Sequence, residues 1–299
     1  MLSGLSPAQK GIFLAIAGFS AFAVSDTCAK WLSQTYSIEA AIAYISLFSV
    51  LCGVLASPLL GGLGRTIGTK KKHIHLGRAV SNVFIAFFVV QAFAHLPLTT
   101  VYTILFLAPF IVTLLAIPVH GEKVSPRHWL VIAAGFSGIL VAFPPGTGSY
   151  NLWVLSAFAA TFFIATLGLL ARKLGPDETV LSLSLYPSSL AALVFLSMAL
   201  WQGAYPSLSD LPIFMLGGIM VTMGLSCIGH AFRISRYAVV SPFNYLQMIW
   251  ALIFGAVLFR DAPESNMLLG AAIIIGSGLT LILMERNGRR RQASSPSSL

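Results

Sequence analysis

One acidic residue stands apart from the other carboxylates of the chain. Of nine Asp and Glu residues, only Asp26 falls well inside a long apolar segment. Lys30 follows four residues later, which on a helix places both side chains on one face, together with Phe22. A carboxylate within a membrane costs free energy and is kept mainly where a partner or water faces it. Asp26 is therefore either a desolvated acid that takes up a proton or a cationic substrate group, or half of a structural ion pair with Lys30.

Two further apolar segments carry polar side chains at helical spacing. His230 lies one helical turn after Ser226, and an imidazole can sense or carry protons between about pH 5 and 8. A lone membrane histidine is also common as a packing residue. In the next segment Asn244, Gln247 and Trp250 follow one another at intervals of three. Their polar groups would either bind a ligand or form hydrogen bonds between helices.

Aromatic side chains form two more rows. Tyr102 and Phe106 share a helix face with Pro109, and Gln91 follows Phe88 by three residues in the preceding segment. A cavity lined by aromatic rings and a few amides suits a flat, moderately polar organic molecule. Such rows are equally typical of ordinary helix packing, so both interpretations stay open.

The elements that position these residues are expected to be membrane helices. The composition leaves too little polar surface for a soluble protein. Of the 299 residues, 57% are hydrophobic and 9% are charged, and the mean hydropathy is +0.87. A membrane helix needs about 20 apolar residues to cross roughly 30 Å of hydrocarbon. Ten stretches meet this requirement and predict an all-α integral membrane protein with ten transmembrane helices: residues 11–32, 38–58, 77–96, 98–118, 127–144, 151–171, 179–201, 211–234, 238–259 and 265–285.

The ten predicted helices fall into two halves with weak internal similarity. Residues 29–32 (AKWL) correspond to residues 171–174 (ARKL), an offset of 142 residues, and Glu122 corresponds to Glu264 at the same offset. Because each half holds an odd number of helices, the second half enters the membrane from the opposite side. We therefore expect two inverted five-helix repeats, residues 1–149 and 150–286, and a disordered cytoplasmic tail, residues 287–299.

The basic residues predict the orientation of these helices. If the N-terminus is inside, 16 of the 18 Lys and Arg residues fall on the cytoplasmic side, and only Lys30 and Arg260 fall outside. This bias predicts an inner-membrane protein with both termini in the cytoplasm. The formal charge of +9 is then a topology signal and an attraction to anionic membrane lipids. Nucleic acid is not an expected partner.

The sequence predicts neither a metal, nor a cofactor, nor a catalytic centre. Cys28, Cys52 and Cys227 fall singly in three predicted helices, without the spacing of metal ligands. The glycine-rich stretch before Lys70 differs from a phosphate-binding loop, because Thr69 precedes the lysine and no strand precedes the stretch. An intramembrane enzyme would need a second catalytic group beside Asp26, and the sequence offers none.

Several short motifs resemble the drug/metabolite transporter superfamily, in its EamA-type branch, over almost the whole chain. They are residues 76–79 (LGRA), 96–99 (LPLT), 108–110 (APF), 121–124 (GEKV) and 135–138 (GFSG). Residues 26–32 (DTCAKWL) look like the first helix of a subgroup that includes bacterial riboflavin and S-adenosylmethionine carriers. That subgroup often carries an arginine midway through the second helix, where this chain has residues 44–46 (YIS), so the resemblance implies no particular substrate. It does imply a ten-helix transporter with a central cavity.

The leading hypothesis is a secondary active transporter that moves a small organic metabolite across the membrane by alternating access. Coupling to protons or to substrate exchange would supply the driving force, because no ATP-binding motif is present. A lipid flippase or a structural membrane subunit is the alternative, and an intramembrane enzyme is less favoured. We expect a monomer or a homodimer.

Overall fold

The computed structural model describes residues 6–120, 126–144, 151–174, 178–235 and 237–294 of the chain. Every regular element within these residues is a helix, so the predicted all-α fold is confirmed. Glu122, one mark of the sequence repeat, lies outside them. In chain order the elements are α1 (Pro7–Leu32), α2 (Ile38–Leu55), α3 (Leu63–Ile67), α4 (Lys72–His95), α5 (Leu98–Leu105), α6 (Ala108–His120), α7 (Pro126–Ala142), α8 (Leu152–Arg172), α9 (Val180–Trp201), α10 (Leu211–Ile234), α11 (Tyr237–Val240), η1 (Ser241–Tyr245), α12 (Leu246–Phe254), η2 (Gly255–Phe259) and α13 (Ser265–Ser294).

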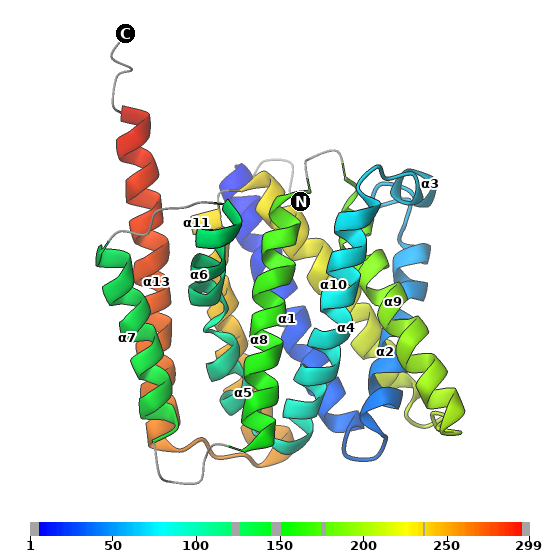
Figure 1. The fold of residues 1–299 in the computed structure, drawn as a ribbon. Helices are drawn as coiled ribbons and strands as arrows, with labels where there is room; N and C mark the ends of the chain where they lie inside the picture. The colour runs from blue at the N-terminus through cyan, green and yellow to red at the C-terminus, as the bar shows by residue number, and fades with distance from the viewer. Residues whose placement is uncertain (1–5, 121–125, 145–150, 175–177, 236, 295–299) are drawn as a thin grey trace.

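The two halves of the chain run in opposite directions. In Figure 1, α1 begins at the upper end of the bundle and runs down, whereas α8 begins at the lower end and runs up. The last helix, α13, also finishes at the upper end, and these names for the two ends are kept below. The helix directions confirm the predicted inversion of the second half.

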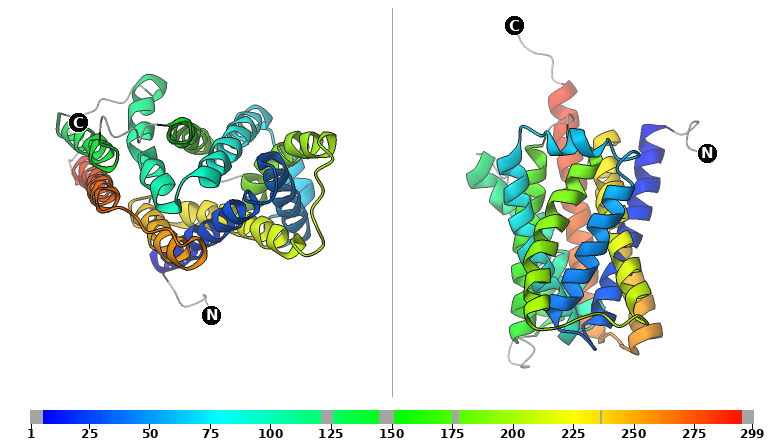
Figure 2. Two further views of the ribbon diagram at one scale, coloured as in Figure 1. Left: turned by 90° about the horizontal axis from the view of Figure 1, so that it is seen from below. Right: turned by 90° about the vertical axis from the view of Figure 1, so that its right-hand side faces the viewer.

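Helix packing follows the same inverted plan. Helix α1 packs along α10, and α8, which occupies the place of α1 in the second half, packs along α4. The pairs α2 with α9 and α7 with α13 join corresponding helices of the two halves. Figure 2 shows α7 and α13 side by side at one edge of the bundle.

The fourth and ninth membrane segments are broken helices. In the fourth, α5 ends at Leu105 and α6 begins at Ala108. Pro109 explains the break, because proline lacks the backbone donor that would bond to the Leu105 carbonyl. The ninth segment passes through α11, η1, α12 and η2, with Pro242 in η1. Broken helices near mid-bundle are where transporters bind their substrates.

Pro187 acts differently, because α9 continues through it. The carbonyl of Leu183, four residues earlier, cannot receive the usual helical hydrogen bond and is left for another donor. At the C-terminus, the predicted disordered tail is wrong for residues 287–294, because α13 extends to Ser294. Arginine and glutamine are good helix formers and continue the preceding helix. Residues 295–299 lie outside the described part of the chain.

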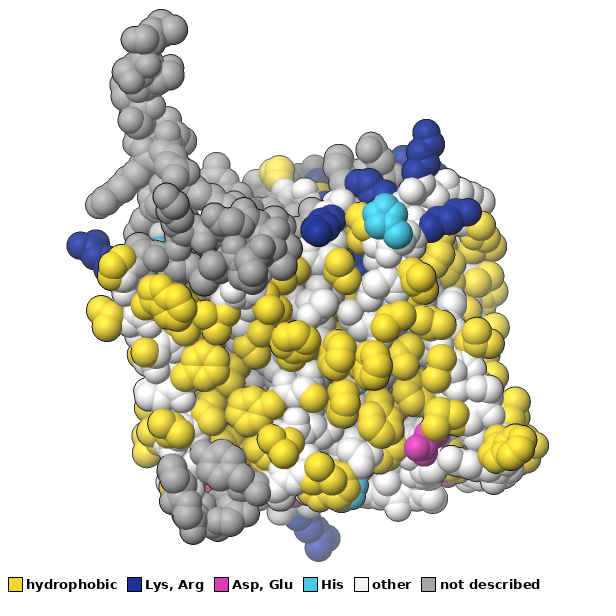
Figure 3. Space-filling model, in the orientation of Figure 1, with side chains coloured by type: hydrophobic (Ala, Val, Ile, Leu, Met, Phe, Trp, Pro, Cys, Tyr) yellow, Lys and Arg dark blue, Asp and Glu magenta, His cyan; other side chains and the backbone are white. Residues whose placement is uncertain are grey.

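The surface agrees with a membrane protein. Nine helical segments among the described residues are long and apolar enough to span a bilayer, and α7 is a shorter apolar helix that makes the tenth. Large apolar side chains such as Leu140, Leu155 and Phe162 are exposed. On the face shown in Figure 3, hydrophobic side chains form a band, and Lys and Arg side chains gather along its upper edge. The chain is a multi-pass membrane protein.

Candidate functional site

A half-buried carboxylate and a buried phenol meet in the lower half of the bundle. The Tyr102 hydroxyl, on α5, donates a hydrogen bond of 2.5 Å to Oδ2 of Asp26, on α1. Tyr102 is 2% exposed and Gln247, on α12, is 9% exposed. The Gln247 side chain interacts with the same hydroxyl. Three predicted site residues from three helices therefore form one polar cluster, and we call Asp26, Tyr102 and Gln247 the lower cluster.

The broken helices position this cluster. Helix α5 begins after Pro97 and ends before the break at Pro109, so it forms a short, separate segment. Tyr102 of α5 and Phe106, which follows its last residue, are both buried, and their rings stack with their centres 6.1 Å apart. The Phe106 ring in turn meets the ring of Tyr245, just before α12, at 5.0 Å. The fourth and ninth segments thus touch through aromatic rings next to Asp26.

Of the two alternatives left open for Asp26, the ion pair with Lys30 is not formed. The Nζ atom of Lys30 donates to the carbonyl oxygens of Phe93 and Leu96, at 3.2 and 2.7 Å, and lies 3.6 Å from Oδ2 of Asp261. It also lies 5.0 Å from the centre of the Phe259 ring. Helical spacing considers only α1, whereas α4 and the segment after η2 offer Lys30 better-placed partners. Lys30 therefore joins α1, the end of α4 and the segment after η2 at the lower end. Asp26 is bound by Tyr102 instead.

Two other predicted residues also lie close to α1. The indole nitrogen of Trp250, on α12, donates to the Ser20 hydroxyl at 2.8 Å, less than two helical turns before Asp26. The ring of Phe22 lies against Gly224 of α10, where an added Cβ atom would come within 3.1 Å of it. Trp250 thus joins α12 to α1, and Phe22 joins α1 to α10.

The remaining predicted residues are more scattered. Asn244 and Gln91 are both half-buried, in η1 and α4. The carbonyl oxygen of Gln91 contacts a ring nitrogen of His95 at 2.9 Å. His230 is exposed near the upper end of α10. Spacing identified polar helix positions correctly, but it could not show which of them face the lower cluster.

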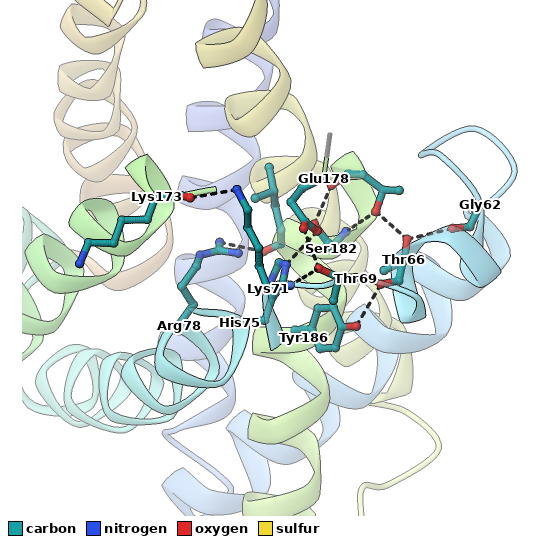
Figure 4. A network of polar contacts seen from close by, with 12 residues as sticks. Gly62, Thr66, Thr69, Lys71, His75, Arg78, Lys173, Glu178, Ser182 and Tyr186 are labelled. Atoms are coloured by element: carbon teal, nitrogen blue, oxygen red, sulfur yellow. Dashed lines mark hydrogen bonds and ion pairs between the residues drawn. The ribbon is translucent and has the colours of Figure 1, made fainter. Parts of the chain in front are cut away.

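Sequence reasoning missed a second polar network at the upper end. Glu178, just before α9, accepts a hydrogen bond of 2.6 Å from Thr69 and contacts Nε2 of His75 at 3.0 Å (Figure 4). Burial alone would raise the pKa of Glu178, but hydrogen bonds from Thr69 and His75 and the nearby charges of His75 and Lys71 hold it below its usual value. The network joins the segment before α4 to the segment before α9, and so links the two halves.

Arg78 lies beside this network and is 3% exposed. Its Nη2 atom donates to the Leu183 carbonyl at 3.3 Å, which is the carbonyl that Pro187 leaves without a helical donor. The signal was present in the sequence as a proline inside a predicted helix. A single sequence cannot show that an arginine 105 residues earlier reaches the freed oxygen.

The fold and the lower cluster define a helical membrane protein of two oppositely oriented halves, with broken helices at its centre. The chain belongs to the EamA-like transporter family, whose model matches twice, at residues 9–143 and 151–284. The resemblance to the EamA-type branch of the drug/metabolite transporters is thus confirmed, and the chain is by family a transporter.

Similar proteins cover nearly the whole chain. A protein of Brucella anthropi named riboflavin transporter is 29% identical over 288 residues, which are 92% of this chain and 99% of the relative. A protein of Rickettsia prowazekii named S-adenosylmethionine uptake transporter is 24% identical over 269 residues, 88% of this chain and 89% of the relative. A solved structure titled "Crystal structure of protein" has a TM-score of 0.67 and 18% identity, covers 91% of this chain and 98% of its own, and shares the fold.

Proposed function

We propose that this chain is a secondary active transporter that carries a small organic metabolite across the cytoplasmic membrane by alternating access. Asp26, in the lower cluster, would couple transport to protons. One observation carries the proposal: a carboxylate inside the bundle has no cationic partner among the described residues and instead accepts a short hydrogen bond from Tyr102. Such a carboxylate can exchange a proton or bind a cationic group without breaking an ion pair.

The surroundings of Asp26 support this role. Tyr102 and Gln247 come from the two broken segments, one in each half, and both reach the neighbourhood of α1. Tyr102 contacts Asp26 within the first half and Gln247 of the second half, so a movement of one half relative to the other must change the contact between Tyr102 and Gln247. Protonation of Asp26 would weaken the hydrogen bond from Tyr102, because the carboxylate is the stronger acceptor. Proton binding and helix movement would thus be coupled through the Tyr102 hydroxyl.

Orientation follows from the distribution of charge. Lys10, Arg65, Lys72 and Arg233 lie near helix ends at the upper end, whereas Lys30 and Arg260 lie at the lower end. We therefore assign the upper end to the cytoplasm and the lower end to the outside. The lower cluster then lies closer to the outer side, where a proton gradient delivers protons.

The first test uses purified protein reconstituted into vesicles. Riboflavin and S-adenosylmethionine appear in the names of the relatives. They are suitable first probes because both are small organic molecules. Wild-type vesicles should accumulate a transported probe when a pH gradient is applied. The Asp26→Asn variant should lose this accumulation, by about tenfold or more, but should still exchange internal for external probe.

Asp210→Asn is the matched control, because it makes the same chemical change in a carboxylate that accepts a hydrogen bond from Tyr36 at the lower end. This variant should accumulate the probe as the wild type does. Unchanged accumulation by Asp26→Asn would refute the coupling role. Reorientation of lipids without any solute flux would refute transport of a metabolite and favour a lipid flippase.

A further inference from the structure

Arg78 holds hydrogen-bond donors that the described part of the protein does not use. Its Nη2 atom bonds to the Leu183 carbonyl at 3.3 Å, but its Nε and Nη1 atoms have no partner among the described residues. Both atoms are buried, and the residue as a whole is 3% exposed. A guanidinium stays charged in proteins, so Arg78 cannot become neutral by losing a proton. Two charged donors are thus left inside the upper end of the bundle.

The charges around Arg78 do not balance it. Arg233, at the end of α10, is the charged neighbour that acts on Arg78, and it repels it. Its guanidinium bonds to the Thr179 carbonyl at 3.4 Å, and the residue is exposed. Glu178 is the described acid nearby, but it is already engaged with Thr69 and His75. The basic side chains therefore outnumber the acids among these residues.

A buried charge without a partner destabilises a protein unless something compensates it. An anion with two or more oxygens matches the paired donors of a guanidinium. The place of Arg78 also favours such a ligand. The side chain extends from α4 toward α9, and it is buried instead of facing the lipid (Figure 4). Arg233 marks the side from which an anion would be attracted.

We propose that Arg78, assisted by Arg233, forms an anion-binding subsite at the upper end of the transport pathway, and that it receives a carboxylate or phosphate group of the transported metabolite. The inference rests on the proposed transport function and adds the class of substrate, an anionic organic molecule. The upper subsite would hold the substrate anion, and the lower cluster would handle the proton. Substrate and proton would then occupy opposite ends of one pathway.

Binding can be tested without measuring transport. Purified protein in detergent is titrated with inorganic phosphate or with succinate, against chloride at equal ionic strength, and thermal stability is followed. The wild type should be stabilised, because a ligand that binds the folded state raises its apparent stability. Arg78→Met should weaken the apparent affinity about tenfold or more. The apparent affinity of Arg78→Lys should lie between those of the wild type and Arg78→Met, because lysine keeps the charge and lacks the paired donors of the guanidinium.

Arg65→Gln is the matched control, because Arg65 is an exposed cation of the same end and should leave anion binding unchanged. Modification by phenylglyoxal gives a second reading that does not depend on stability. Phosphate should protect Arg78 in the wild type and leave Arg65 reactive. If neither phosphate nor succinate stabilises the wild type or protects Arg78, the subsite does not exist.

Two other outcomes would also overturn the proposal. If protection of Arg78 requires bilayer nanodiscs with phosphatidylglycerol and is not produced by soluble anions, the subsite holds a lipid headgroup. Asp177 lies outside the described residues; if soluble anions bind only to the Asp177→Asn variant, Arg78 already has an internal counter-ion. Proton-coupled flux that persists alongside either outcome would leave the proposed function standing. Anion binding without any flux would leave an anion-binding site at Arg78 but would refute both the transport function and the place of this site in a transport pathway.

Discussion

The two ends of the bundle handle buried charge in opposite ways. At the lower end, Lys30 is matched by Asp261 and by two backbone carbonyls, and Asp26 is matched by Tyr102. At the upper end, Glu178 is matched by His75 and Thr69, but Arg78 keeps two donors without a described partner. A buried charge without a partner is destabilising unless something compensates it. We therefore infer that the contacts of Lys30 seal the lower end and that Arg78 leaves the upper end able to bind a ligand.

The largest expected effect tests the seal at the lower end. Replacing Lys30 by Met removes the donor that joins α1 to the end of α4 and leaves Asp261 without its cation. Asp261 is 25% exposed, so water compensates part of the loss. We expect the free energy of unfolding in detergent to fall by about 2–3 kcal/mol, as measured by chemical denaturation.

The double variant Lys30→Met, Asp261→Asn separates the ion pair from the backbone contacts. It should recover about 1 kcal/mol, because the second change removes the unpaired carboxylate. No recovery would mean that the bonds from Lys30 to the Phe93 and Leu96 carbonyls carry the whole effect. A fully stable single variant would show that the lower end is not sealed by Lys30.

A smaller effect is expected for the link between the halves at the upper end. Glu178→Gln replaces a carboxylate that binds Thr69 and His75. The side chain is 9% exposed, and we expect the variant to lose about 1–2 kcal/mol near neutral pH. The pKa of Glu178 is below its usual value when folded, so its contribution is present above the unfolded pKa and lost as the pH falls through the folded one.

The difference in unfolding free energy between wild type and Glu178→Gln should therefore be constant near pH 6–7 and should shrink below about pH 4. Chemical denaturation at a series of pH values measures it. Glu264→Gln is the control, because Glu264 is exposed at the start of α13 and should show little difference at any pH. A difference for Glu178→Gln that does not change with pH would exclude the ionised carboxylate as its cause.

The sequence was sufficient to predict elements and poor at predicting partners. Apolar length predicted the helices, and Pro109 accounts for the break between α5 and α6, because both signals are local. Asp26 was identified by its position in an apolar segment, but its partner Tyr102 is 76 residues away. Spacing could not decide between a desolvated acid and an ion pair with Lys30, because helical spacing describes one helix and cannot compare it with others.

The upper network was missed for a related reason. Glu178 falls in a connecting segment, where an acid is ordinary, and its contact His75 lies 103 residues earlier. Arg78 falls near the start of α4, where positive charge is expected from topology alone. Only its burial and its bond to the Leu183 carbonyl distinguish it from the exposed basic residues of the same end.

The smallest expected effect concerns the contact that joins α12 to α1 above the lower cluster. Trp250→Phe keeps an aromatic ring beside Phe254 and removes the donor to the Ser20 hydroxyl. We expect a loss of about 0.5–1 kcal/mol in unfolding free energy, because one neutral hydrogen bond disappears from a partly buried place. Ser20→Ala should cost a similar amount, and the double variant should cost little more than either single change. If the two losses add fully, the indole and the hydroxyl act independently, and α12 is held against α1 by packing alone. The ninth segment would then be freer to move against α1, and the lower end would depend chiefly on Lys30.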